Sequence, residues 1–182
     1  MGRKILVLGM LTLANATGQV VSVLFHGLAE PAEAQARMLA AQMLAAVGVQ
    51  LEWCESAKNC RHWSDRIVVN MEAQAPPSLP SGAMAAAQLF EGRNIRIYHD
   101  RVNRLTNKSL KPRLLAYVLV HEITHLLQAC DWHAPRGIMK ATWTQADYAA
   151  ISRTTLAFEP IDIDLIRLGL TKRRGLLALA AR

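Results

Sequence analysis

The longest regular pattern of apolar residues in this sequence runs from about residue 111 to residue 128. Apolar side chains recur there at intervals of three and four, the spacing of an α-helix, and they cover most of the helix surface. Pro112 suits the first turn of such a helix, because its missing N–H would have no partner there. The pattern therefore predicts a long helix buried on most sides, through Leu114, Leu115, Val118, Leu119, Ile123, Leu126 and Leu127.

Three further helices follow from shorter signals. A proline opens a helix that we expect over residues 31–47. Thr144, with Asp147 three positions later, has the spacing of a capping box and begins another. After a further proline, residues 161–170 form a last short helix, and we expect the basic and apolar tail, residues 171–182, to fray.

Three segments have the character of β-strands. They are residues 49–53, 67–71 and 94–102, and the last alternates isoleucine with arginine and tyrosine. Residues 75–82 contain several prolines, which cannot donate to a sheet ladder, so we expect a loop there.

The middle of the long helix carries an HExxH motif. At 3.6 residues per turn, His121 and His125 lie on one face a turn apart, so both imidazoles can reach one metal ion. Glu122 can then hold a water at the metal and take its proton. The alternative is a buried helix that carries these side chains by chance, although burying them without a partner is costly.

Two features after the helix strengthen the metal-site hypothesis. His133 follows His125 by eight residues, past an expected helix end within residues 128–130. Gly137 can form a tight turn that places Met139 beneath the site.

The segment HEITHLLQACDWHAPRGIMKATW resembles the active-site segment of the small secreted zinc peptidases of metzincin type. These carry HExxH, a third histidine and a methionine turn. The close resemblance covers about residues 114–143, with looser agreement in element order elsewhere. The usual pattern has glycine seven residues after the first histidine and the third ligand ten after it, positions that are Gln128 and Asp131 here. His133 comes two residues late, and we treat it as the shifted ligand.

The resemblance implies an α+β, zincin-like domain, in which a small mixed sheet packs on the active-site helix, with N- and C-terminal helices. It implies an exported, zinc-dependent endopeptidase that hydrolyses peptide bonds in a peptide or protein substrate. His121, His125 and His133 would bind Zn²⁺ and leave a fourth position for water. Glu122 would act as the general base.

Three finer assignments follow from the same resemblance. The strand at residues 94–102 would border the cleft and pair with an extended peptide. Tyr148 would either donate to the oxyanion, as a tyrosine after the methionine turn does in some metzincins, or pack in the core. Asp131 would accept a hydrogen bond from a ligand imidazole.

Other arrangements remain open. A non-catalytic zincin-like module for metal binding or protein interaction would keep the fold, with or without the metal, but it would have no need of Glu122. In a gluzincin arrangement Glu159 or another downstream carboxylate would be the third ligand, which leaves residues 137–141 without an explanation. His62 and His99 are possible additional ligands, but lone histidines more often make ordinary hydrogen bonds.

Residues 1–16 have the features of a secretory signal peptide: a basic start, a short apolar core and the cleavage site Ala14-Asn15-Ala16. We expect the zincin-like domain over residues 17–182, secreted or periplasmic, without stable membrane association once the leader is removed. The alternative is an uncleaved anchor from Ile5 to Phe25, a stretch without charged residues.

The cysteines agree with export. Cys54 and Cys60 have five residues between them, in a loop bounded by tryptophans, and in an exported protein a disulfide is the natural interpretation. A metal site there is disfavoured, because the spacing is wider than CxxC. We expect the remaining Cys130 to be a small buried apolar residue.

Length and charge add little about partners. The 182 residues suit one domain with a core of its own. The formal net charge is +7, but no basic run is interleaved with aromatic residues, so the charge indicates a solvated basic surface rather than nucleic-acid binding. We expect a monomer.

Overall fold

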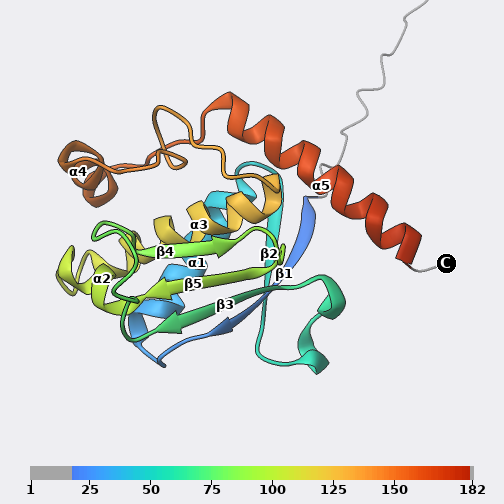
Figure 1. Cartoon of the computed structure of the whole chain (residues 1–182), viewed down its shortest axis with the longest axis horizontal. Helices are drawn as coiled ribbons and strands as arrows, with labels where there is room; N and C mark the ends of the chain where they lie inside the picture. The colour runs from blue at the N-terminus through green and yellow to red at the C-terminus, as the bar shows by residue number, and fades with distance from the viewer. Residues whose placement is uncertain (1–17, 181–182) are drawn as a thin grey trace, which may run out of the picture.

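The computed structural model describes residues 18–180 and contains a five-stranded mixed sheet (Figure 1). Its strands lie in the order β2 (Val49–Cys54), β1 (Gln19–His26), β3 (Ile67–Glu72), β5 (Asn94–Tyr98) and β4 (Ala85–Gln88). The first four are parallel to one another, and β4 runs antiparallel beside β5. The expected small mixed sheet is therefore present.

Strand β1, between β2 and β3, is absent from the elements expected from the sequence. Val21 to Leu24 are all buried, because the strand has a neighbour on each side. Inner parallel strands carry continuous apolar runs, and such a run is hard to distinguish from the apolar part of a leader. An anchor reaching Phe25 is therefore wrong, since residues 19–25 belong to the sheet. The expected leader, residues 1–16, lies outside the described residues, and between residues 18 and 180 no helix has the length and apolarity to cross a membrane.

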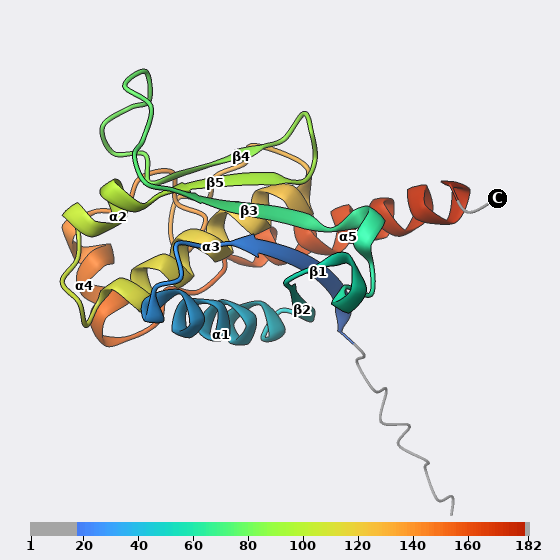
Figure 2. The ribbon, with the colours of Figure 1, turned by 90° about the horizontal axis from the view of Figure 1, so that it is seen from below.

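Two helices pack against each other on one face of the sheet, α1 (Pro31–Ala45) and α3 (Lys111–Gln128) (Figure 2). Helix α1 makes the crossover between the parallel strands β1 and β2, and the chain turns into β2 at Gly48, which has a positive φ of 84°. Helix α3 is buried along nearly its whole length, as its apolar pattern predicts.

Helix α5 (Pro160–Ala180) crosses the C-terminal end of α3. Gly169 makes this approach possible, because a Cβ there would lie 1.8 Å from the carbonyl oxygen of Leu127. Further along, Arg173 Nε lies 2.6 Å from an Asp65 carboxylate oxygen, which holds α5 beside the connection from β2 to β3. The prediction of a short helix with a frayed tail is wrong. Pro160 is the first residue of this helix, a position that suits proline. The ion pair of Arg173 with Asp65 supports the continuation of the helix beyond residue 170.

The strands nearest α3 also differ from expectation. The strand predicted for residues 94–102 ends at Tyr98, and α2 (His99–Arg104) follows at once. The edge of the sheet beside α3 is formed by β4, which has no strand signal in the sequence because alanine has little preference for strands. Strand β5 lies between β3 and β4 and has no free edge, so the expectation that residues 94–102 pair with an extended peptide is wrong.

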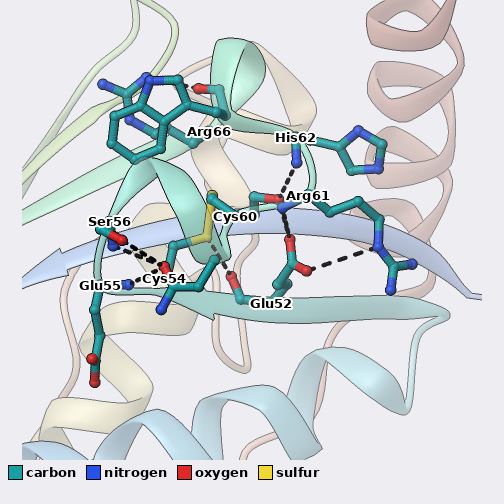
Figure 3. The surroundings of a disulfide bond; sticks show 11 residues. Glu52, Cys54, Glu55, Ser56, Cys60, Arg61, His62 and Arg66 are labelled. Carbon is teal, nitrogen blue, oxygen red and sulfur yellow. Dashed lines mark hydrogen bonds and ion pairs between the residues drawn. A yellow bond between two sulfur atoms is a disulfide. The ribbon is translucent and has the colours of Figure 1, made fainter.

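The predicted disulfide between Cys54 and Cys60 is confirmed (Figure 3). Both cysteines are buried beside the sheet, where they pack in a small apolar cluster. Glu52 ties the same loop to the sheet, because its carboxylate accepts hydrogen bonds from Ser22 Oγ at 2.6 Å and from the Arg61 amide at 2.9 Å.

Candidate metal centre

Three histidines converge at the surface of α3. The helix places His121 and His125 one turn apart, with ring centroids separated by 4.8 Å. The chain then reverses and returns His133 to the same point, 5.4 Å from the His121 ring and 4.7 Å from the His125 ring. One ring nitrogen from each of the three lies within 4.8 Å of the others, a spacing that one ion can bridge.

Backbone carbonyls determine which nitrogens face this point. His121 Nδ1 lies 2.9 Å from the Ile138 oxygen, and His125 Nδ1 lies 3.1 Å from the Cys130 oxygen. A carbonyl only accepts, so each Nδ1 carries the proton and each Nε2 presents a lone pair. The two Nε2 atoms are 3.1 Å apart. Two lone pairs at this distance repel unless a cation lies between them, so the donor set fits a metal such as zinc.

The electrostatic surroundings keep these imidazoles neutral. Burial lowers the pKa of His121 from 6.5 to about 4, although the Ile138 carbonyl opposes the shift and the other two imidazoles add to it. Burial also lowers the pKa of His125. Neutral imidazole is the form that binds metal ions. Near pH 7 both rings are therefore ready to act as ligands.

The return of the chain depends on Ala129. Helix α3 runs through Gln128, the position of the usual metzincin glycine, and Ala129 then takes a left-handed conformation with φ 54° and ψ 39°. The next residue, Cys130, is half-buried, so the expectation of a buried apolar residue is wrong. Its backbone carbonyl accepts the hydrogen bond from His125. His133 itself is exposed.

The expected tight turn at Gly137 is present. Gly137 has φ 76°, and a Cβ there would lie 2.1 Å from the Ala157 carbonyl oxygen. Met139 is fully buried, and its carbonyl accepts from the Ala134 amide at 2.8 Å. The turn therefore fixes the Ile138 carbonyl that orients His121, a contribution that sequence reasoning misses because every residue has a carbonyl.

Glu122 lies beside the histidines and is 9% exposed. Burial raises the pKa of its carboxyl from 4.5 to about 7, while the Ala87 amide, which donates to the carboxyl, partly opposes the shift. A carboxyl with such a pKa can take and return a proton near neutrality.

These residues open onto a cleft of about 930 Å³. Strand β4 and residues 80–84 line one side of it, and residues 140–143 line another. Tyr148 also lines the cleft, from α4 (Gln145–Arg153), which begins at the predicted capping box of Thr144. The Tyr148 ring packs edge-on to Trp143 at 6.3 Å, so it makes the expected packing contact while facing the cleft.

Asp131 does not join the three histidines in the group of close ligand atoms. It is exposed, lines the cleft, and is near enough to His125 to raise the pKa of that imidazole. The hydrogen-bonding role expected of it is taken by the carbonyls of Ile138 and Cys130.

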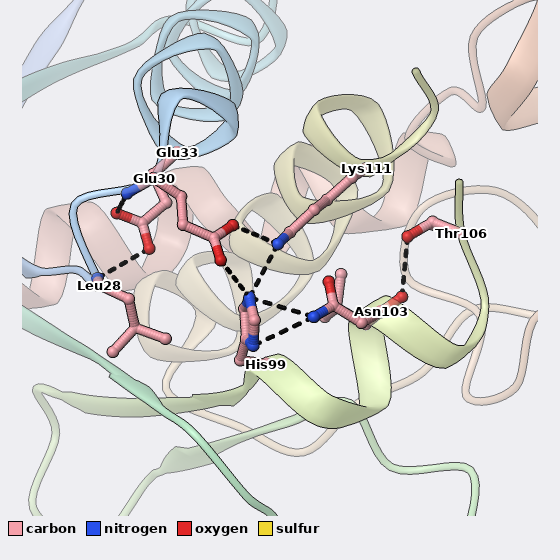
Figure 4. Close-up of polar contacts among 8 residues, drawn as sticks. Leu28, Glu30, Glu33, His99, Asn103, Thr106 and Lys111 are labelled. Atoms are coloured by element: carbon pink, nitrogen blue, oxygen red, sulfur yellow. Dashed lines mark hydrogen bonds and ion pairs between the residues drawn. The ribbon is translucent and has the colours of Figure 1, made fainter. Parts of the chain in front are cut away.

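The other candidate ligands lie elsewhere. His99 contacts Glu30, with Nε2 2.7 Å from a carboxylate oxygen, in a polar cluster that joins the starts of α1 and α3 (Figure 4). His62 belongs to the loop of the disulfide, where its amide donates to a sheet residue. Glu159 pairs with Arg136 at 3.1 Å, which gives no support to a gluzincin arrangement.

Comparison with solved structures places this architecture beside archaemetzincin from Methanopyrus kandleri. The match covers 87% of this chain and 99% of that chain, with a TM-score of 0.56 and 12% sequence identity. No family model matches the sequence, and no curated protein matches it. At this identity the likeness concerns the fold. The chain therefore has the mixed α/β, zincin-like fold of archaemetzincin, and the expected fold class is confirmed.

Proposed function

We propose that this protein is an exported zinc metallopeptidase that cleaves internal bonds of peptides or proteins as a monomer. The observation that supports it most strongly is the convergence of three imidazoles beside a buried carboxyl in an open cleft. The zincin-like fold supports the class of enzyme, and the disulfide is compatible with export.

His121, His125 and His133 would hold the zinc ion, with the first two aimed by the carbonyls of Ile138 and Cys130. Bound zinc would bring the pKa of a water molecule to about 7 and polarise the scissile carbonyl. Glu122 takes the proton of the attacking water and passes it to the leaving amine. Its burial raises the pKa of the carboxyl to about 7, which suits a group that takes and returns a proton near neutrality.

Strand β4 is the surface on which an extended peptide would bind. Tyr98 donates from its amide to the Met84 carbonyl at 2.8 Å, so by antiparallel alternation Ala86 also faces β5. The main-chain groups of Ala85 and Ala87 then face the outer edge, which agrees with the Ala87 amide lowering the pKa of Glu122. Ala85 and the Ala87 carbonyl remain for a peptide that adds to the sheet.

The test is the Glu122→Gln variant. The substitution keeps size and hydrogen bonding but removes the proton acceptor, so zinc content should stay and cleavage of unfolded casein should fall by at least ~10²-fold. A chelator should abolish cleavage by the unaltered protein, and added zinc should restore it. Zinc bound without any cleavage by the unaltered protein would contradict the proposal and leave a non-catalytic zincin-like module.

A further inference from the structure

One end of the cleft carries two arginines, Arg101 and Arg104, both from α2. Within the described residues their ion pairs go to one carboxylate: Arg104 Nη2 lies 2.9 Å and Arg101 Nε 3.8 Å from Asp100 Oδ2. Two guanidinium groups that share one carboxylate leave this end of the cleft with a net positive charge.

The two arginines differ in what they can still bind. The Arg101 side chain is 12% exposed and donates to the carbonyls of Pro80 and Ser81, so it holds the loop that walls the cleft. The Arg104 side chain is 61% exposed, and one of its five N–H donors goes to Asp100. Arg104 is therefore the group able to meet a carboxylate that enters the cleft.

The direction of a bound peptide places its C-terminal side at this end. Strand β4 starts beside α2, because Met84 is hydrogen-bonded to the last residue of β5, and it runs away from α2 (Figure 1). Antiparallel pairing is the slightly more stable mode of adding a strand. A peptide paired in that way runs toward α2, so residues after the cleaved bond approach Arg104.

The cleft that holds the histidines and Arg104 is also lined by apolar and aromatic side chains, among them Val118, Trp143 and Tyr148. The Trp143 ring lies 5.9 Å from the His121 ring, so a peptide would place apolar surface beside the candidate metal centre. An arginine at the rim of an apolar pocket selects carboxylates by a charge-assisted, bidentate hydrogen bond.

We propose that the cleft selects peptides with a carboxylate a few residues after the cleaved bond, and that Arg104 determines this preference. The inference rests on the proposed peptidase function and names its substrate class. The carboxylate comes from an Asp or Glu side chain or from the free C-terminus of the peptide, two sources that bind a guanidinium through the same group.

Cleavage of matched peptides tests the proposal. In each peptide, one of the first three positions after the cleaved bond carries Glu, Gln or Lys, and the rest of the sequence is constant. Every peptide is made in two forms, one with a free C-terminal carboxylate and one with a C-terminal amide. At one of these positions the Glu peptide should have a kcat/KM about fivefold above that of the Gln peptide, or the free acid should exceed the amide by the same factor. This factor is the upper range for an exposed ion pair. Arg104→Gln should abolish the preference, and Arg104→Glu should transfer it to Lys.

Arg167→Gln is the matched control, because Arg167 is 70% exposed and pairs with Asp164 within its own helix, outside the cleft. It should keep the full preference. Equal cleavage of Glu and Lys peptides by the unaltered protein, or an unchanged preference in Arg104→Gln, overturns the inference while leaving the peptidase function intact.

A binding measurement separates the two proposals. Fluorescence anisotropy with labelled peptides and the Glu122→Gln protein, which does not consume them, should show the same preference of about fivefold, weakened by salt. The expected preference in binding does not depend on whether any peptide is cleaved. Absence of cleavage with charge-selective binding would refute only the enzyme, and binding without charge selection would refute the role of Arg104.

Discussion

The two halves of the candidate metal centre are built in different ways. The helix half, His121 and His125 on α3, is fixed by the packing of a helix that is buried along nearly its whole length. The loop half, residues 129–140, ends in an exposed His133 and is held by a few backbone hydrogen bonds, among them Ala134 N–H to the Met139 oxygen and Ile138 N–H to the Ala157 oxygen.

The halves nevertheless depend on each other. The carbonyls that orient the helix histidines, from Ile138 and Cys130, both belong to the loop half. The helix therefore supplies two candidate ligands at a fixed spacing, and the loop supplies their orientation and the third candidate ligand. Substitutions in the helix half should affect stability and metal binding together, whereas exposed positions in the loop half should affect metal binding alone.

The largest expected effect is the loss of zinc and activity when a candidate ligand is removed from either half. His133→Ala and His125→Ala should each lose zinc and more than ~10²-fold of the activity, more than the loss of a partner that only supports a ligand. Without metal, His133→Ala should unfold like the unaltered protein within about 0.5 kcal/mol, since the side chain is exposed. His125→Ala should cost about 1–3 kcal/mol, because it leaves the Cys130 carbonyl without its donor.

Asp131→Ala is the control at the usual metzincin spacing. It should keep its zinc and lose less than ~10-fold in activity, since the imidazole donors are taken by carbonyls. Metal analysis and denaturant unfolding of the three purified variants measure these differences. Zinc retained in His133→Ala and lost in Asp131→Ala would return the third ligand to position 131.

The second effect probes what holds the loop half. Gly137→Ala should destabilise by at least ~2 kcal/mol, because the left-handed backbone costs about 1–2 kcal/mol and the contact with the Ala157 carbonyl adds an overpacking term of roughly 1–3 kcal/mol. Gly92→Ala is the matched control, since Gly92 has φ 69° and an added Cβ would meet nothing within 4 Å. It should show the backbone cost alone, with zinc affinity unchanged. Equal losses in thermal unfolding would mean that Gly137 has room for a side chain.

The same division explains how far sequence reasoning reaches. His121, Glu122 and His125 are recognisable because a helix makes their spacing equivalent to proximity. The proximity of His133 depends on a chain reversal at Ala129, so its assignment needed the resemblance to metzincins. The carbonyls of Ile138 and Cys130 have no sequence signature. Strand β1 is obscured by the apolar run that continues from the leader, and β4 by its alanines, so the sheet edge beside the site could not be predicted.

The smallest expected effect lies at the junction of the two halves. Ala129 holds a left-handed conformation that costs an L-residue about 1–2 kcal/mol, and glycine adopts it without this strain. Ala129→Gly also gives the unfolded chain more freedom, which offsets about 0.4–1 kcal/mol. The net expectation is a gain near ~0.5 kcal/mol.

Ala29, with φ 59° before α1 and away from the cleft, is the matched control, and Ala29→Gly should gain as much. Denaturant unfolding of the two metal-free variants measures both gains, and zinc titration should show the same affinity in each. A loss of stability in Ala129→Gly alone would mean that the Ala129 methyl group itself supports the reversal, and weaker zinc binding would mean that the stiffness of this one residue helps to hold His133 against the helix.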